Sequence, residues 1–357
     1  MNITEHMETF GHEQLSVFVD KNVGLKAYVA IHDTTLGPAL GGIRIWPHET
    51  EQQAIEDVLR LARAMTYKSS AAGLYLGGGK ALIVADPRTD KTEALFRAFG
   101  RFLDTLGGRC IATEDVGMTV ADLLHVAQET KHVTGIPVSH GGSGDPSIMT
   151  GLGVYQGMRA CAKEVLGVDS LRGVIVAVQG YGKVASHLVP HLKKDGARII
   201  ATDLFPEARA RAAADGLEVL NDPEAIYDIQ CDVFAPCALG GVLNGETVPR
   251  LQSRIVCGSA NNQLLDINAA KALKERGILY APDYVVNAGG VINISFEIGR
   301  PYEEAAAREK TLAIYNTMRS VIATAKDRDI TTAEAADRLA EERIEQMRRI
   351  RRMHTGA

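Results

Sequence analysis

Residues 173–202 contain the pattern that most constrains what this chain can fold into. The apolar run over 173–179 predicts a buried strand, residues 182–194 predict a helix, and residues 197–202 predict a second strand. A Gly-x-Gly-x-x-Ala turn joins the first strand to the helix. Two strands joined through a helix lie parallel in one sheet, so the sequence predicts an α/β fold.

The turn itself indicates what the sheet binds. Gly180 permits a tight turn, Gly182 lets the backbone approach a pyrophosphate, and Ala185 keeps the helix close to the strand. The positive end of the helix dipole then faces the phosphates. We therefore expect a Rossmann-type, doubly wound dinucleotide-binding domain here.

Asp203 follows the second strand, where a carboxylate hydrogen-bonds a ribose 2′-hydroxyl and repels a 2′-phosphate. This favours NAD as the cofactor over NADP. Arg209 and Arg211 are near enough in sequence to help bind a 2′-phosphate, which would favour NADP instead.

The composition narrows the class of protein. The chain has 357 residues, more than one ordinary core holds, and a net charge of −5, which argues against nucleic-acid partners. Its five cysteines are scattered without a C-x-x-C pair, so we expect them to be reduced thiols in a reducing compartment. With neither a signal peptide nor a long apolar run in the sequence, we expect a cytoplasmic protein with no membrane contact.

The N-terminal part also alternates between the two periodicities. We expect strands over 25–34, 81–85 and 109–113, and helices over 50–68 and 91–108. This alternation predicts a second α/β domain.

A glycine-rich stretch near 140–150 is the best hinge candidate. We expect a first domain over 1–140 and the dinucleotide-binding domain over 148–330, which opens with a helix over about 148–166. Residues 302–353 read as two long charged helices, and we expect the last, about 331–357, to return to the first domain.

Lys80 is the residue of the first half that most suggests catalysis. It follows Gly77, Gly78 and Gly79 and precedes an apolar run, and glycine lets a backbone pass close to a ligand. Loss of hydration in an apolar cleft lowers the pKa of an ammonium, which makes a lysine a usable general base.

Two further charged residues could act with Lys80. Lys68, near the end of the preceding helix, could depress that pKa further or bind a substrate carboxylate. Asp115 follows a strand end, where α/β active sites collect their residues. Taken singly, Lys68 is more typical of a residue that complements a helix dipole, and Asp115 of a residue that caps a turn. No recognised metal-binding spacing occurs, so no metal is expected.

Seven segments together resemble the amino-acid dehydrogenases, in particular the leucine, valine, phenylalanine and tryptophan enzymes. The segments occur in this order: IHDTTLGPALGG, MTYK, GGGKALI, EDVG, FAPCALGG, GSANNQL and APDYVVNAGGVIN. The resemblance implies NAD-dependent, reversible oxidative deamination of an L-amino acid to a 2-oxo acid and ammonium. It also implies a substrate-binding N-terminal domain, an NAD-binding second domain, and a homo-oligomer, either octamer or dimer.

The resemblance also implies roles for individual residues. Lys80 would activate the water that attacks the iminium carbon, and Asp115 would carry the proton on and off the amino nitrogen. Lys68 and Asn262 would bind the substrate carboxylate. The side-chain pocket would be lined by Leu40, Gly41, Met65, Thr113, Val291 and Ile294. The cofactor would be bound by Thr150, Gly180, Gly182, Val184, Ala185, Asp203 and Asn287.

This pocket predicts the class of substrate. It contains no basic residue, so burying the second carboxylate of glutamate would be costly. An aliphatic side chain of the size of leucine, valine or isoleucine suits it. Thr113 and Ile294 depart from the residues usual in leucine dehydrogenases, as does Lys183 near the phosphates. An aromatic amino acid as substrate, and a non-catalytic NAD-binding sensor, are the alternatives.

Overall fold

The computed structural model describes residues 2–354, with side chains to residue 350, and groups them into two compact units. The first unit contains the chain up to Asp145, the segment Ile294–Glu303 and the chain from Ala340 onward. The second contains Pro146–Asn293 and Glu304–Leu339.

Two segments of this division differ from the predicted boundaries. Ile294–Glu303 was not expected in the first unit, but Thr134 Oγ1 donates a hydrogen bond to the Ile294 carbonyl at 2.6 Å. The last helix joins the first unit from Ala340 rather than from 331. Arg343 holds it there by donating to the carbonyls of Ser70 and Leu74 at 3.0 and 2.8 Å.

The first unit is built on a five-stranded mixed sheet in the order β1-β2-β4-β3-β5. Strands β3, β4 and β5 are parallel, and β2 is antiparallel to both β1 and β4. Its elements are α1 (Ile3–Phe10), β1 (Gln14–Asp20), β2 (Leu25–Asp33), β3 (Ala39–Ile45), α2 (Glu51–Ala71), β4 (Gly77–Ile83), α3 (Glu93–Asp104), β5 (Cys110–Glu114) and α4 (Val120–Ala127).

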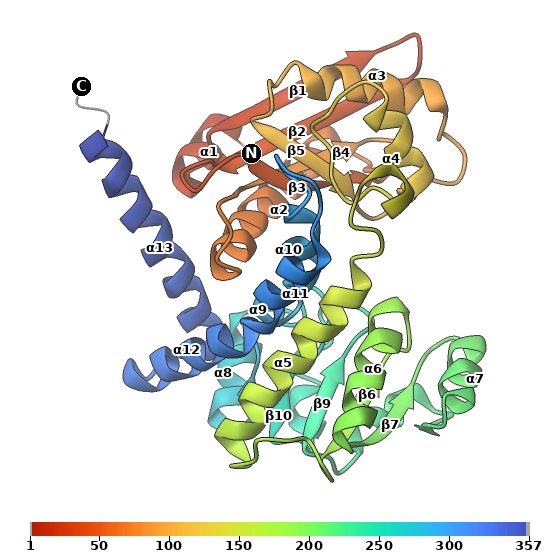
Figure 1. Cartoon of the computed structure of the whole chain (residues 1–357), viewed down its shortest axis with the longest axis vertical. Coiled ribbons are helices and arrows are strands. Elements are labelled where there is room, and N and C mark those ends of the chain that lie inside the picture. Colours follow the sequence, from red (N-terminus) through yellow and green to blue (C-terminus); the bar gives the residue numbers. More distant parts are fainter. Residues whose placement is uncertain (1, 355–357) are drawn as a thin grey trace. The chain divides into compact units, whose positions relative to one another are not determined.

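The two faces of this sheet have different covers (Figure 1). Helix α2 packs through Ile55, Val58 and Leu59 on the face that carries Tyr28 and Leu82. Helices α3 and α4 pack on the opposite face, which carries Ala81 and Ile83. Since successive residues of a strand point to opposite faces, Lys80 lies on the α2 face.

Helix α2 begins where the sequence indicates a start. Thr50 and Gln53 form a capping box in which the Thr50 hydroxyl accepts from the Gln53 amide and the Gln53 side chain accepts from the Thr50 amide. Both bonds satisfy amide groups that have no partner inside the helix. The apolar residues that follow at helical spacing form its buried face.

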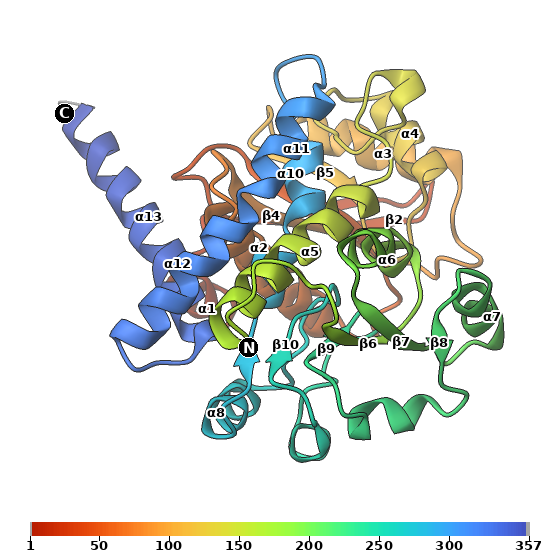
Figure 2. The same ribbon diagram turned by 60° about the horizontal axis from the view of Figure 1, so that its bottom comes forward.

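The second unit contains a six-stranded sheet in the order β11-β10-β9-β6-β7-β8, and every strand pair in it is parallel. Numbered from β6, this is the 3-2-1-4-5-6 order of a Rossmann fold. Figure 2 shows β10, β9, β6, β7 and β8 side by side in this sequence. The predicted α/β class is therefore confirmed. The strands are β6 (Ile175–Gln179), β7 (Arg198–Thr202), β8 (Glu218–Val219), β9 (Val233–Pro236), β10 (Ile255–Val256) and β11 (Leu279–Tyr280).

Helices surround this parallel sheet. The C-terminal region contains three helices rather than the expected two, because α11 and α12 separate at Ala313 and a further break follows at Asp329, which has a φ of 53°.

None of the helices within residues 2–354 has the length and apolar character needed to cross a membrane. A cytoplasmic location stays a prediction. The helices are α5 (Ser147–Val165), α6 (Lys183–Asp195), α7 (Pro206–Ala214), α8 (Ile267–Glu275), α9 (Asp283–Val286), α10 (Gly289–Ser295), α11 (Glu304–Leu312), α12 (Ile314–Asp327) and α13 (Thr332–His354).

Candidate active site

Lys80 and Asp115 form a direct ion pair in the first unit. Lys80 Nζ lies 2.7 Å from Asp115 Oδ2, and the side chains are 6% and 25% exposed. Lys80 is in the middle of β4, and Asp115 follows the last residue of β5. Strand β3 lies between β4 and β5 and is parallel to both. Its residue Gly42 pairs with Thr113, two residues before Asp115, and the next residue, Ile43, pairs with Ala81, next to Lys80. Because successive residues alternate between faces, Gly42, Lys80 and Asp115 lie on the same face of the sheet.

The surroundings shift both pKa values. Burial lowers the pKa of Lys80, and the attraction of Asp115 offsets part of that effect. Burial alone would raise the pKa of Asp115, but Lys80 and Arg44 outweigh it and hold this pKa below its ordinary value. A base with a lowered pKa beside an ionised carboxylate is an arrangement suited to moving protons near neutral pH.

Arg44 is a part of this site that the sequence analysis missed. Its Nε donates to Asp115 Oδ2 at 3.1 Å, and its Nη1 donates to Asp57 Oδ2 at 3.1 Å. Arg44 lies in β3 and its side chain is 22% exposed. An arginine inside the otherwise apolar segment GGIRI was the available signal, but nothing local to that segment indicates its partners.

The glycines of β3 and β4 have a packing role. A Cβ on Gly78 would lie 2.1 Å from the Thr66 amide nitrogen of α2, and a Cβ on Gly41 would lie 1.8 Å from the Gly79 carbonyl oxygen. A Cβ on Gly42 would lie 2.6 Å from Asp115 Cβ and 3.1 Å from Lys80 Nζ. The glycines thus let α2 and the strands approach closely and leave room for the ion pair.

Four predicted substrate residues lie on β3, α2 and β5 of the first unit. Leu40 and Gly41 are buried in β3, Met65 is partly buried in α2, and Thr113 is partly buried in β5. Lys68 is half-buried in the last turn of α2, a position that also complements the helix dipole.

Thr113 and Ile294 share one neighbour, Gly135. A Cβ on Gly135 would lie 2.6 Å from Thr113 Oγ1 and 3.5 Å from Ile294 Cγ2. The carboxylate of Glu297 holds Gly135 by accepting a hydrogen bond from its amide at 2.9 Å. Thr113 and Ile294 therefore lie against the same backbone.

The predicted dinucleotide turn has the geometry of an anion site. Gly180 has a φ of 96°, and a Cβ there would lie 2.6 Å from Ala238 Cβ. Gly182 is the N-cap of α6, where no side chain caps the helix, and nothing lies within 4 Å of its Cβ position. Uncapped amides with open space above them fit a pyrophosphate. Ala185 is buried at the first turn of α6, and Val184 beside it is partly buried.

The charged residues after β7 are ordered by backbone contacts. Asp203 accepts from the amides of Tyr181 and Phe205 at 2.7 and 2.9 Å. Each carboxylate oxygen keeps a second lone pair for a ribose hydroxyl. Arg209 donates to the Asp203 carbonyl at 2.6 Å, and Arg211 donates to the Tyr181 carbonyl at 3.3 Å. Each contact uses one nitrogen of its guanidinium group.

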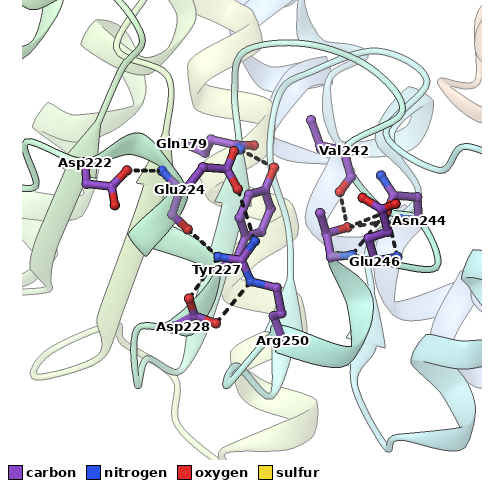
Figure 3. A network of polar contacts seen from close by, with 10 residues as sticks. Gln179, Asp222, Glu224, Tyr227, Asp228, Val242, Asn244, Glu246 and Arg250 are labelled. Carbon is purple, nitrogen blue, oxygen red and sulfur yellow. Dashed lines mark hydrogen bonds and ion pairs between the residues drawn. The ribbon is translucent and has the colours of Figure 1, made fainter.

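A polar network holds the end of β6 just before the turn (Figure 3). Gln179 Nε2 donates to the Tyr227 hydroxyl at 2.6 Å, and the Arg250 guanidinium lies 5.0 Å from the centre of the Tyr227 ring. Arg250 also bridges to Glu224 and Asp228 at 3.1 and 2.8 Å. The network fixes the residue that precedes Gly180.

The remaining predicted residues lie in the second unit. Thr150 in α5 is next to the start of α10, since a Cβ on Gly290 would lie 2.7 Å from Thr150 Oγ1. Asn287 Nδ2 donates to Asn261 Oδ1 at 2.8 Å, while its buried Oδ1 has no partner in the described part of the chain. Such an acceptor fits an amide-bearing ligand such as a nicotinamide. Asn262 is exposed with a φ of 52°, and Val291 is buried in α10.

Comparison with known proteins shows the family of this chain. Family models described as the Glu/Leu/Phe/Val dehydrogenase dimerisation domain and as glutamate/leucine/phenylalanine/valine dehydrogenase match residues 12–132 and residues 141–203 and 207–352. The chain belongs to the glutamate/leucine/phenylalanine/valine dehydrogenase family. The predicted membership is thereby confirmed, and the chain is an amino-acid dehydrogenase, an enzyme rather than a sensor.

Individual relatives cover nearly the whole chain. Leucine dehydrogenase of Geobacillus stearothermophilus is 54% identical over 98% of this chain and 95% of its own. Phenylalanine dehydrogenase of Caldalkalibacillus thermarum is 45% identical over 95% of this chain and 93% of its own. The crystal structure of L-tryptophan dehydrogenase from Nostoc punctiforme superposes with a TM-score of 0.86 at 42% identity, covering 97% of this chain and 99% of that one.

The structure has no grouping of three or more histidine, cysteine, aspartate or glutamate side chains suited to a metal among the residues it describes.

Proposed function

We propose that this protein catalyses the NAD-dependent, reversible oxidative deamination of a branched-chain aliphatic L-amino acid. The amino acid, NAD⁺ and water give the 2-oxo acid, ammonium, NADH and a proton. The observation that carries the proposal is the buried ion pair of Lys80 and Asp115 at 2.7 Å, in a chain whose other unit has a Rossmann strand order and an uncapped glycine turn. Its 54% identity to a leucine dehydrogenase supports the aliphatic substrate over an aromatic one, since the phenylalanine enzyme is 45% identical.

In the proposed reaction, Lys68 and Asn262 bind the substrate carboxylate and so orient its α-carbon. Bound NAD⁺ supplies a hydride acceptor for that carbon. Lys80, as the neutral amine, takes a proton from the water that attacks the resulting iminium carbon. Asp115 takes and returns protons at the substrate nitrogen, which leaves as ammonia and is protonated to ammonium. Leu40, Gly41, Met65, Thr113, Val291 and Ile294 would surround the substrate side chain.

The cofactor-binding residues form the other half of the proposal. The amides at the start of α6 would bind the pyrophosphate, with Gly180, Gly182, Val184 and Ala185 forming the turn. Asp203 would bind the adenosine ribose and repel a 2′-phosphate, which favours NAD over NADP. Thr150 and Asn287 would contact the nicotinamide.

The test is the initial rate of NADH formation with leucine, valine, isoleucine, phenylalanine and glutamate. We expect the highest kcat/KM with a branched-chain substrate and loss of several orders of magnitude in kcat for Lys80→Ala, because the base is removed. The exposed Lys21 provides the matched control Lys21→Ala. NAD binding by Lys80→Ala should persist. A wild type that prefers phenylalanine to leucine would overturn the proposed substrate class. A wild type that forms no NADH with any of the five amino acids would overturn the proposed reaction.

We further propose that the protein acts as a homo-oligomer, an octamer or a dimer. The family description of residues 12–132 as a dimerisation domain supports this. The amphipathic C-terminal helix α13 packs partly on its own first unit through Arg343, so it need not be the interface. Light scattering at micromolar concentration should give a multiple of 38.4 kDa, and a stable monomer would contradict the proposal.

A further inference from the structure

We propose that Arg44 is a positioning residue that orients the Asp115 carboxylate and keeps it ionised while Lys80 changes its charge during turnover. This inference rests on the proposed function, because it assigns Lys80 and Asp115 to proton transfer. It adds a role for a residue that touches neither water nor substrate in that mechanism.

The geometry of the contacts carries the orienting role. Lys80 Nζ and Arg44 Nε approach the same oxygen of Asp115, Oδ2, at 2.7 and 3.1 Å. The other oxygen, Oδ1, accepts no hydrogen bond from the described residues, and the Asp115 side chain is 25% exposed. Two donors on one oxygen fix the plane of the carboxylate and leave Oδ1 as the atom that can exchange a proton with the substrate nitrogen.

Arg44 is itself held in place from the far side. Its Nη1 donates to Asp57 Oδ2 at 3.1 Å, and Asp57 also binds Arg60 at 2.9 Å and lies 3.5 Å from His48. A planar guanidinium that bridges two carboxylates has little freedom to rotate. Arg44 therefore acts as a rigid link between α2 and the end of β5.

The charges explain why an arginine suits this position. Lys80 must lose its proton to act as a base, and at that moment it no longer stabilises the Asp115 carboxylate. Arginine stays protonated at any pH at which the protein is folded, so Arg44 supplies a constant charge. The same charge repels the Lys80 ammonium and so favours its deprotonation, while Asp57 opposes this effect.

The groups around the pair come from four elements. Arg44 lies on β3, Lys80 on β4, Asp57 on α2 and Asp115 after β5, with His48 behind Asp57 and Lys68 further along α2. Arg44 is a permanent cation in contact with the Asp115 carboxylate, whereas Arg60 is paired with Asp57.

The experiment compares Arg44→Gln, Arg44→Lys and the control Arg60→Gln by kcat, KM and the pH dependence of kcat/KM for leucine oxidation. Activity should rise with pH as Lys80 loses its proton. In Arg44→Gln this rise should move to higher pH, and kcat should fall roughly tenfold or more with a smaller change in KM, because the carboxylate is misplaced. Arg44→Lys should keep the position of the rise but not the full kcat, since an ammonium cannot bridge both carboxylates. Arg60→Gln should match the wild type.

The outcomes separate the two proposals. A wild type that oxidises no amino acid would overturn the proposed function and this inference together. An active wild type with an unshifted pH profile and normal kcat in Arg44→Gln would overturn this inference alone, as would an Arg60→Gln variant that shifts equally. If Arg44→Gln does not fold, Arg44→Lys decides: a wild-type kcat there would exclude the bridging role.

Discussion

Gly42→Ala tests directly whether the ion pair needs the space that the sheet leaves for it. Gly42 lies in β3 between the strands that carry Lys80 and Asp115, and its φ is not in the left-handed region, so alanine is compatible with the backbone. The new Cβ would lie 2.6 Å from Asp115 Cβ and 3.1 Å from Lys80 Nζ. Carbon atoms in contact are about 3.5–4.0 Å apart, so Asp115 must move by roughly 1 Å.

The size of the expected effect follows from that displacement. A shift of about 1 Å stretches the 2.7 Å contact between Lys80 Nζ and Asp115 Oδ2 beyond hydrogen-bond distance. A hydrogen bond between charged groups contributes about 1.5–3 kcal/mol, which corresponds to roughly a tenfold to hundredfold loss of rate. We therefore expect kcat/KM for leucine to fall by that factor in Gly42→Ala.

Gly79→Ala is the matched control. Gly79 lies in β4 next to Lys80, but its Cβ would meet Ala39 Cβ and Cys110 Sγ, both at 3.1 Å and both away from the ion pair. This variant should lose some stability through overpacking, about 1–3 kcal/mol, yet retain most of its kcat. Thermal unfolding and initial rates of NADH formation are measured for both. Wild-type kcat/KM in Gly42→Ala, or an equal loss in Gly79→Ala, would refute the reasoning.

Three further predictions concern the cofactor, the substrate and pH. Asp203→Ser should narrow the preference for NAD over NADP, measured as kcat/KM for each, and equal values in the wild type would contradict the role of Asp203. Thr113→Ala and Ile294→Val should each shift kcat/KM towards larger side chains by at most roughly tenfold to a hundredfold, and an unchanged order of valine, leucine and phenylalanine would exclude both from the pocket. Burial lowers the pKa of His32 to about 4, so the folded state binds fewer protons than the unfolded state below about pH 6.5. The contribution of His32 to stability is therefore complete above that pH and is lost as the pH falls towards 4. The urea midpoint of unfolding should drop between pH 7 and pH 5, and it should drop by less in His32→Gln. An equal drop in the wild type and in His32→Gln would show that His32 is not the cause.

The sequence predicted best the features that depend on neighbouring residues. The strand, glycine turn and helix over 173–202 appear as β6, α6 and β7, because the hydrophobic period and the conformational freedom of Gly180 act over a few residues. The capping box of Thr50 and Gln53 and the start of α2 are local in the same sense. The two-domain α/β class followed from the alternation of strand and helix periodicities along the chain.

Predictions that depended on long-range packing were less accurate. The strand expected over 81–85 begins at Gly77, because the glycines belong to the sheet and not to a loop before it. Their function in the fold is to admit Thr66 of α2 against Gly78, and only the close approach of that helix reveals it. The break between α11 and α12 was likewise missed, since the charged pattern continues across it.

The sequence by itself determined the kinds of groups available to this protein: a lysine in an apolar strand, an aspartate after another strand, and a glycine turn ahead of a helix. Only the tertiary structure decided that Lys80 and Arg44 contact the same oxygen of Asp115 and that Asp57 holds this arginine. The reason is that parallel strands pair residues far apart in sequence, and a side chain's pKa and orientation depend on the charges so brought within hydrogen-bond distance.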